Sequence, residues 1–117
     1  MDGRGKRNKG ATGERELAAL LSDALGRVVK RNLGQAREGG CDINIQHWNI
    51  ECKRQEKIKI YDWMQQAKES CAAGQSPVVA FRKNGKDWLV TMTLNDWIGL
   101  VRECLESDSE NVFFFFF

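Results

Sequence analysis

Residues 41–54, "CDINIQHWNIECKR", combine the pattern of a hydrophobic hairpin with three charged side chains. The side chains of a β-strand alternate between two faces, so the isoleucines of both strands can point toward a core. Asp42, Glu51 and Lys53 then fall on the opposite faces, and a two-residue turn expected near His47 and Trp48 folds Asp42 back toward the other two. The stretch therefore predicts two neighbouring strands that carry a cluster of charges.

The positive charge of the chain is concentrated in the half that contains this cluster. The formal net charge is only +2, but residues 1–59 hold 13 basic and 8 acidic residues, whereas residues 60–117 hold 5 and 8. Basic residues beside paired carboxylates suit a polyanion brought up to a metal ion, because carboxylates alone would repel phosphate. A solvated basic face without a ligand is the alternative.

The composition is that of one small domain. The 117 residues are enough for a single core, and the apolar content of 42% is ordinary for a globular protein. No apolar run approaches the roughly 18 residues of a membrane span, so no membrane association is expected. The basic, glycine-rich start lacks the apolar segment of a secretory signal, so the expected location is cytoplasmic, in the host if the protein is phage-encoded. The four cysteines are widely spaced, which favours reduced thiols over a zinc site.

Helix and strand signals alternate along the chain. The expected elements are a helix over 13–25, a strand over 27–31, a glycine-rich loop over 32–40, the two strands of the opening stretch, a helix over 63–73, a hairpin over 77–93 and a helix over 94–105. Thr12 and Thr93 are expected N-caps, Asp62 is expected to head the middle helix, and Gly26 is a stop. Asn84-Gly85 suits a type I′ turn. The order α-β-β-β-α-β-β-α predicts an α/β protein with a mixed central β-sheet flanked by helices.

Four segments together resemble a known nuclease family. "KGATGERELAALL", "VVKRN", "CDINI" and "IECKR" are similar to the archaeal-type Holliday junction resolvases and related phage proteins of the PD-(D/E)XK nuclease superfamily. The likeness runs from about Lys9 to the end of the second hairpin and implies a restriction-endonuclease-like core. Cys41 stands where that superfamily's motif has its proline. A bare D-x8-E-x-K pattern is weak, but the same pattern after an ERE helix is more specific.

The resemblance implies a catalytic set of Glu14, Asp42, Glu51 and Lys53. Hydrolysis of a phosphodiester needs positive charge at the phosphate and a deprotonated water, and a divalent cation supplies both. Mg²⁺ takes oxygen ligands, so Asp42, Glu51 and the backbone carbonyl of Cys52 are the expected ligands, and Mn²⁺ is expected to substitute. Glu14 is expected to hold a second ion or orient a water, and Lys53 to position the attacking water. Taken singly, Glu14 could be a solvated helix residue, and Glu51 with Lys53 a plain surface pair.

Further residues are expected around this set. The expected DNA-binding residues are Lys9, Arg15, Lys30, Arg31 and Arg54, where Lys30 can take the place of Arg31 by a one-residue shift. Gln65 and Gln66 are possible accessory residues, because related nucleases often carry a glutamine on the helix after the E-x-K strand. Exposed helical glutamines without a role are the alternative.

These expectations give a domain plan and a function. The plan is a basic flexible N-terminus over 1–10, a nuclease domain over 11–106 and an acidic, phenylalanine-rich tail over 107–117, which is either a disordered extension or a segment that binds a protein partner. The expected function is a Mg²⁺-dependent endonuclease that resolves branched or four-way junction DNA as a homodimer, since a two-fold axis matches two nicks to the junction. Trp63, Trp88 and Trp97 are expected in the core or a subunit interface. The alternatives are another PD-(D/E)XK endonuclease or exonuclease, or a catalytically silent DNA-binding module.

Overall fold

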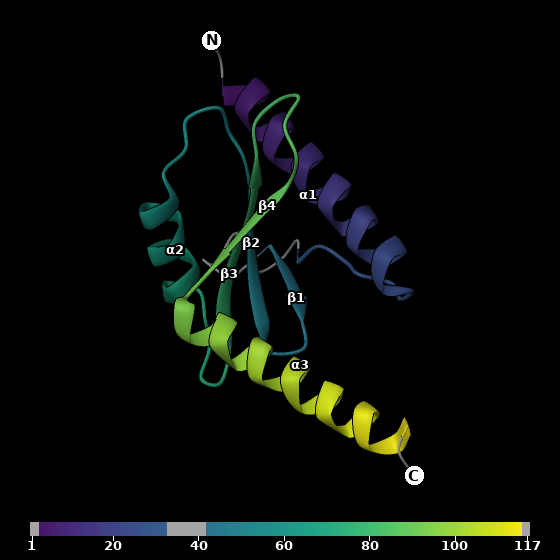
Figure 1. The fold of residues 1–117 in the computed structure, drawn as a ribbon. Helices are drawn as coiled ribbons and strands as arrows, with labels where there is room; N and C mark the ends of the chain where they lie inside the picture. Colours follow the sequence, from purple (N-terminus) through teal and green to yellow (C-terminus); the bar gives the residue numbers. More distant parts are fainter. Residues whose placement is uncertain (1–2, 33–41, 116–117) are drawn as a thin grey trace.

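The chain folds into a four-stranded sheet with a helix on each face (Figure 1). The computed structural model describes the backbone of residues 3–32 and 42–115, and the side chains of residues 10–32 and 42–108. The elements are α1 (Gly3–Leu25), β1 (Ile43–Ile45), β2 (Trp48–Arg54), α2 (Ile60–Glu69), β3 (Ser76–Arg82), β4 (Leu89–Met92) and α3 (Leu94–Phe115). The α/β class with a mixed, helix-flanked sheet is therefore confirmed.

The sheet has the order β1-β2-β3-β4. The central strands β2 and β3 are parallel, and the two outer strands pair with them antiparallel. Ile45 pairs with Trp48, so only two residues connect β1 to β2, and Gln46 makes that turn with a φ of 52°. The hairpin predicted from the opening stretch is present.

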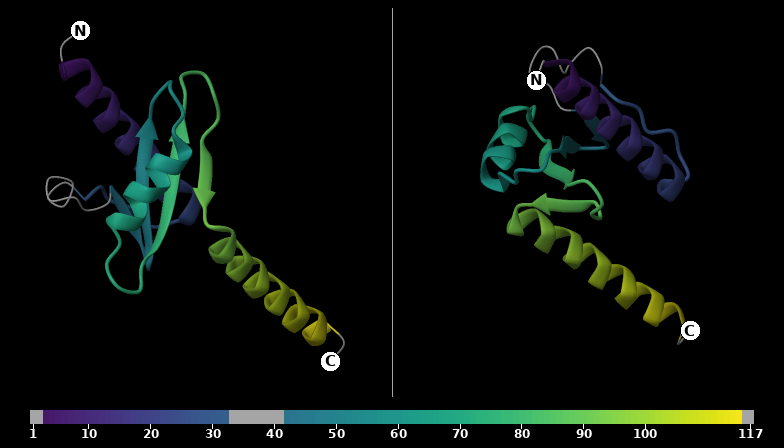
Figure 2. Two further views of the ribbon diagram at one scale, coloured as in Figure 1. Left: turned by 90° about the vertical axis from the view of Figure 1, so that its left-hand side faces the viewer. Right: turned by 90° about the horizontal axis from the view of Figure 1, so that it is seen from above.

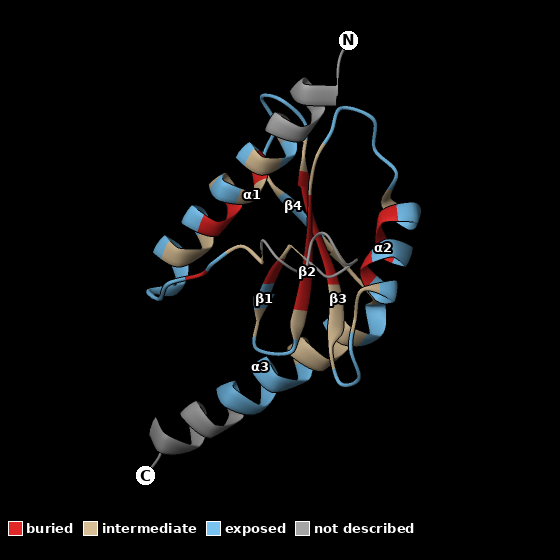
Figure 3. Ribbon diagram, turned by 180° about the vertical axis from the view of Figure 1, so that it is seen from behind, coloured by how far each residue is buried: buried red, intermediate tan, exposed pale blue. Residues whose placement is uncertain are grey.

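The core lies in two clusters on the two faces of the sheet (Figure 3). The cluster under α1 contains Leu17, Ala18, Val29, Ile43, Ile50, Cys52, Val78 and Ala80. The cluster under α2 contains Trp63, Met64, Ala67, Val79 and Phe81. Along β2, alternate residues enter the first cluster, which leaves Asn49, Glu51 and Lys53 on the side of α2.

The prediction of a strand over residues 27–31 is wrong. This segment makes a single bridge, between Arg31 and Ile43, so the order is α-β-β-α-β-β-α with one strand fewer. The reason is a side chain of α1. Ser22 Oγ accepts a bond from the amide nitrogen of Val29 at 2.9 Å and donates its own proton to the carbonyl of Ala18 at 2.7 Å. The amide nitrogen of Val29 is thus satisfied by α1 instead of by a ladder.

Both long helices extend beyond their predicted bounds. α1 begins at Gly3, so Thr12 lies inside the helix, and α3 continues to Phe115. The only proline of the chain is Pro77, so no proline interrupts the extra turns. The predicted stop and cap are confirmed: Gly26 has a φ of 64°, and Thr93 Oγ1 accepts from the amide of Asp96 at 3.1 Å.

Two predicted turn signals fail. α2 begins at Ile60 after Lys59, which makes no side-chain cap, so Asp62 lies in the first turn instead of heading the helix. Between β3 and β4, Gly85 has a φ of 69° but Asn84 does not have a positive φ, whereas a type I′ turn needs both. The strands are joined by the longer loop 83–88.

α3 leads away from the sheet (Figure 2). Leu94, Trp97 and Leu105 of α3 are 69%, 54% and 60% exposed, although they are large and apolar. The part of the chain that the structure describes contains no helix with the length and apolarity to cross a membrane.

Candidate active site

Asp42 and Glu51 face each other across the β1–β2 hairpin. The register pairs Ile43 with Ile50, and one further step outward places Asp42 opposite Glu51. Asp42 Oδ2 accepts a bond from the amide nitrogen of Cys52 at 2.7 Å, which fixes the carboxylate beside β2. The alternation of strand side chains and the two-residue turn are therefore sufficient to bring these two carboxylates together.

Glu14 brings a third carboxylate from α1. Its carboxyl group lies within hydrogen-bonding reach of Asp42. It also accepts from Arg31 Nε at 3.2 Å, and both of these side chains are about one fifth exposed. We name Glu14, Asp42 and Glu51 the carboxylate cluster.

α2 supplies the second wall of the site. Lys53 Nζ donates to Gln66 Oε1 at 2.8 Å, and Ser70 Oγ donates to Glu51 Oε1 at 3.2 Å. Gln65 instead donates to Glu69 along the helix, so of the two predicted glutamines only Gln66 meets the site. Ser70 is a residue of the site that was not predicted from the sequence, although its spacing of four residues from Gln66 puts both on one face of a helix.

The pKa values of all three carboxyl groups are raised. Burial is the main cause in each case, because it removes water from the charged form. The neighbouring Asp42 carboxylate raises the pKa of Glu14 further, and the Glu51 carboxylate does the same for Asp42. Lys53 opposes the rise at Glu51. Burial, together with the carboxylates of Asp42, Glu14 and Glu16, raises the pKa of the Cys52 thiol to about 12, so it stays protonated.

A divalent cation fits the chemistry of this cluster. Three partly buried carboxyl groups whose pKa values are raised present hard oxygen ligands and unfavourable negative charge, which a cation would neutralise. Within the described residues, however, no three acidic, histidine or cysteine side chains are arranged to hold an ion by themselves. Glu14 and Asp42 lie within reach of a shared hydrogen bond, but the three carboxyl groups are not arranged to hold one ion by themselves. Backbone and water oxygens would therefore have to complete the coordination shell of the cation.

The predicted DNA-binding residues have different surroundings. Arg15 and Lys30 are exposed, whereas Arg31 is paired with Glu14. Arg54 packs against Gly13 of α1, donates from Nη2 to Asn84 Oδ1 at 3.0 Å, and has two buried nitrogens without a partner. The side chain of Lys9 lies outside the described residues.

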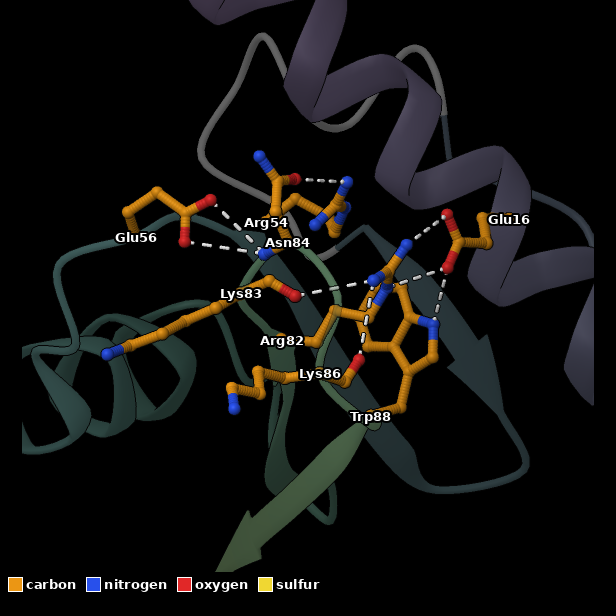
Figure 4. A network of polar contacts seen from close by, with 8 residues as sticks. All are labelled: Glu16, Arg54, Glu56, Arg82, Lys83, Asn84, Lys86 and Trp88. Carbon is orange, nitrogen blue, oxygen red and sulfur yellow. Dashed lines mark hydrogen bonds and ion pairs between the residues drawn. The ribbon is translucent and has the colours of Figure 1, made fainter.

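A second polar network lies on the α1 side of the sheet (Figure 4). Arg82 donates to both oxygens of Glu16, from Nε at 2.8 Å and from Nη2 at 3.2 Å. Trp88 Nε1 donates to Glu16 at 2.8 Å, and the Arg82 guanidinium lies 5.7 Å from the centre of the Trp88 ring. The bond from Arg82 is the main reason that the pKa of Glu16 is lowered.

The comparison with protein families agrees with this arrangement. Residues 5–113 match the family described as "Phage putative PDDEXK endonuclease". The chain belongs to this family. It is therefore a nuclease of the PD-(D/E)XK superfamily, whose members act on DNA and generally use divalent metal ions. Comparison with curated proteins and with solved structures gave no match.

Proposed function

We propose that the protein is a Mg²⁺-dependent, structure-specific DNA endonuclease, and that it cuts branched DNA such as the four-way Holliday junction. The observation that carries the catalytic part is the carboxylate cluster beside Lys53, assembled from α1 and the β1–β2 hairpin. The family supports a nuclease, and junction selectivity is our extension from the resemblance to resolvases.

The residues of the cluster have different roles in this proposal. Asp42, Glu51 and the Cys52 carbonyl would hold the cation, which when bound would supply positive charge at the scissile phosphate and lower the pKa of a water. Mn²⁺ can replace Mg²⁺, because both take oxygen ligands. Glu14 orients a water or holds a second ion, and its pairing with Arg31 limits its own negative charge.

Lys53 positions the attacking water and stabilises the extra negative charge of the transition state. Its ammonium group is held by Gln66, so the reaction does not have to immobilise a flexible side chain. Ser70 Oγ lies 3.2 Å from Glu51 Oε1 and 3.0 Å from the backbone carbonyl of Gln66, so its single proton is shared between them and helps to orient that carboxylate. Gln66 and Ser70 are thus positioning residues, whereas Gln65 bonds to Glu69 on the same helix.

We assign phosphate contacts close to the cluster to the exposed residues Arg15 and Lys30, and a further contact to Lys9, whose side chain lies outside the described residues. Arg31 contributes positive charge to the site indirectly, because its guanidinium is paired with the carboxylate of Glu14. Arg54 acts mainly through its charge, since its guanidinium is largely covered by the protein. These assignments agree with the electrostatic, sequence-independent contacts by which proteins hold DNA.

We further propose a homodimer. β4 lies at the edge of the described sheet, with Leu89 and Val90 56% and 63% exposed, and α3 follows it directly with Leu94 and Trp97 exposed. An apolar edge next to an apolar helix face favours self-association over exposure to water. A second copy is the occupant that fits the substrate, because two matched nicks in a four-way junction require two active sites related by a two-fold axis.

Sedimentation tests the dimer. We expect a dimer at micromolar concentration and a monomer for Leu94→Asp together with Val90→Asp. A wild-type monomer with and without junction DNA would contradict the proposal.

The tail over 107–117 is proposed to bind a protein partner. Deleting residues 113–117 should leave DNA cleavage unchanged.

A substrate panel tests the function itself. Wild-type protein should cut a four-way junction in Mg²⁺ or Mn²⁺ and not in chelator, and should cut matched duplex, flap and single-stranded DNA more slowly. Equal rates on all four would replace junction selectivity by a general nuclease. Binding without cleavage in either metal would leave a silent DNA-binding module.

A further inference from the structure

Two loops at one end of the sheet carry lysines that the carboxylate cluster does not use. β2 and β3 are parallel, so the loops that follow them, 55–59 and 83–88, leave the sheet at the same end of these strands. Four exposed lysines lie on these loops, and we name them the two-loop surface: Lys57, Lys59, Lys83 and Lys86. None of the four has an ion pair within the described part of the chain.

The charge of these segments is strongly positive. Residues 53–59 and 82–88 together contain seven basic and two acidic residues, a net charge of +5, whereas the whole chain has +2. One of the two acids, Glu56, already accepts bonds from the backbone of the neighbouring loop. Of the seven basic residues, Arg82 is paired with Glu16, and Arg54 has two buried nitrogens without a hydrogen-bond partner. Such a concentration of positive charge attracts polyanions.

The two loops are tied to each other. The amide nitrogen of Asn84 donates to both carboxylate oxygens of Glu56, at 3.1 and 3.3 Å. Arg54 Nη2 donates to Asn84 Oδ1 at 3.0 Å, so the end of β2 also holds the hairpin loop. The lysines of both loops are therefore presented by one connected platform, which reduces the entropy lost when a ligand binds.

Two backbone carbonyl groups of the hairpin loop 83–88 point toward the protein. Arg82 Nη1 donates to the carbonyls of Lys83 and Lys86, each at 3.3 Å, while its other nitrogens hold Glu16. These two carbonyl oxygens, which would repel a phosphate, thus accept hydrogen bonds from Arg82 on the protein side of the loop. The side chains of Lys83 and Lys86 lead away from the Glu16–Arg82 pair (Figure 4). The loop is built to offer ammonium groups outward.

We propose that the two-loop surface binds the phosphate backbone of a DNA duplex arm beyond the cleavage site. This inference rests on the proposed function and extends it to a second contact region. Lys53 is in register with Phe81, and both lie on the α2 side of the sheet, from which β3 continues into the loop with Lys83. Lysines act on phosphate as point charges, so the contact is independent of base sequence.

The test uses three double variants of the full chain. Lys83→Ala/Lys86→Ala and Lys57→Ala/Lys59→Ala each remove two charges from the surface, whereas Lys68→Ala/Arg102→Ala removes two exposed charges from α2 and α3 as a control. Binding to a duplex longer than one helical turn is measured in Ca²⁺ over a series of salt concentrations. Each surface variant should bind more weakly and lose about 1.8 units of the slope of log K against log salt, because each phosphate contact contributes about 0.9.

Two results would overturn the proposal: an unchanged slope in both surface variants, or an equal loss in the control. A short duplex that cannot extend past the carboxylate cluster should bind wild type and surface variants alike, and a persisting difference would also contradict the assignment. Cleavage by the wild type is followed in Mg²⁺ in parallel. If it never cuts but the slope still depends on the loops, the nuclease proposal fails and the surface proposal stands.

Discussion

Glu14 and Glu16 lie two residues apart on α1, but they belong to opposite electrostatic environments. Glu14 meets another carboxyl group, that of Asp42, and burial together with this neighbour raises its pKa. Glu16 meets Arg82 and Trp88, and the hydrogen bond from Arg82 lowers its pKa. The same side chain on the same helix is therefore under strain from like charge in one place and satisfied in the other.

The difference separates a site built for a ligand from one built for stability. In the carboxylate cluster, the charge of Asp42 and Glu51 is only partly compensated by Lys53, which leaves a preference for a cation. In the second network, Glu16 has two donors from Arg82 and one from Trp88, so its charge is satisfied within the protein. The expected effects of substitutions differ accordingly.

The largest effect should come from removing a ligand charge without changing volume. Asp42→Asn and Glu51→Gln should lower the single-turnover cleavage rate by at least about a hundredfold, because cation binding and its electrostatic contribution are lost. Glu16→Gln, the matched control on α1, should retain the rate within a few-fold. DNA binding in Ca²⁺ should survive in all three variants. Equal rates for Asp42→Asn and wild type would remove the distinction between the two environments.

Lys53→Ala should also abolish cutting while DNA binding is retained. Gln66→Ala should lower the rate less, since it frees the ammonium group without removing it. We expect Gln66→Glu to cut DNA faster than Gln66→Ala, because the glutamate keeps an acceptor for the ammonium group of Lys53. If Gln66→Ala cuts at the wild-type rate, Gln66 has no positioning role.

Gly13 sets the distance between α1 and β2 on which both environments depend. A Cβ at this position would clash with the Cγ of Arg54. Gly13→Ala should therefore destabilise the protein by about 1–3 kcal/mol, the usual cost of overpacking, and lower the cleavage rate through Glu14. Urea unfolding measures the first effect. Gly10→Ala is the control, because its Cβ would meet no atom within 4 Å.

Substitutions of the two glutamates should change stability in opposite directions at neutral pH. Glu16→Gln should cost about 1–2 kcal/mol, because Arg82 loses a charge-assisted partner. Glu14→Gln should be neutral or stabilising without metal, since it removes repulsion from Asp42. Urea unfolding in the presence of chelator measures both. A stability loss at Glu14 as large as that at Glu16 would contradict the comparison.

A smaller effect should appear in the pH dependence of stability. The folded pKa of Asp42 lies above its ordinary value of 3.8, so the folded state binds more protons and stability falls as pH rises from 3.8 through the folded pKa. Glu16 has a lowered pKa, so its contribution is present above its ordinary value of 4.5 and is lost on acidification through the folded pKa.

Thermal unfolding of Asp42→Asn and Glu16→Gln over a pH series measures the two signs. Relative to wild type, Asp42→Asn should gain stability toward neutral pH, and Glu16→Gln should lose it. Both differences should disappear at low pH. The same sign in both variants would contradict the assigned pKa directions.

The sequence was sufficient to predict that a two-residue turn brings Asp42 back toward Glu51 and Lys53, because strand alternation and a short turn are local properties. It did not give the register: the turn lies at residues 46–47, one residue earlier than expected, and this shift places Asp42 opposite Glu51. The family resemblance, and not the local pattern, singled out Glu14 from Glu16. The pairing of Glu16 with Arg82 joins residues 66 positions apart and depends on how α1 crosses the sheet, which no local signal encodes.

Errors of the sequence analysis have similar causes. The strand expected at 27–31 did not form because Ser22 of α1 satisfies the amide nitrogen of Val29. The first helix was predicted to start at an N-cap, Thr12, but the helix begins at Gly3 and continues through the glycines of residues 3–12. In both cases a local propensity was overridden by a contact or by continuation of a neighbouring element. The assignment of catalytic and metal-binding roles remains a prediction.

Direct titration of the divalent cation tests the central claim, that the carboxylate cluster is a metal site and the Glu16 environment is not. Calorimetry with Mg²⁺ and Mn²⁺ on DNA-free protein should detect binding in wild type and in Glu16→Gln, and much weaker binding in Asp42→Asn and Glu51→Gln. No binding in wild type, or equal binding in wild type and Asp42→Asn, would contradict the account.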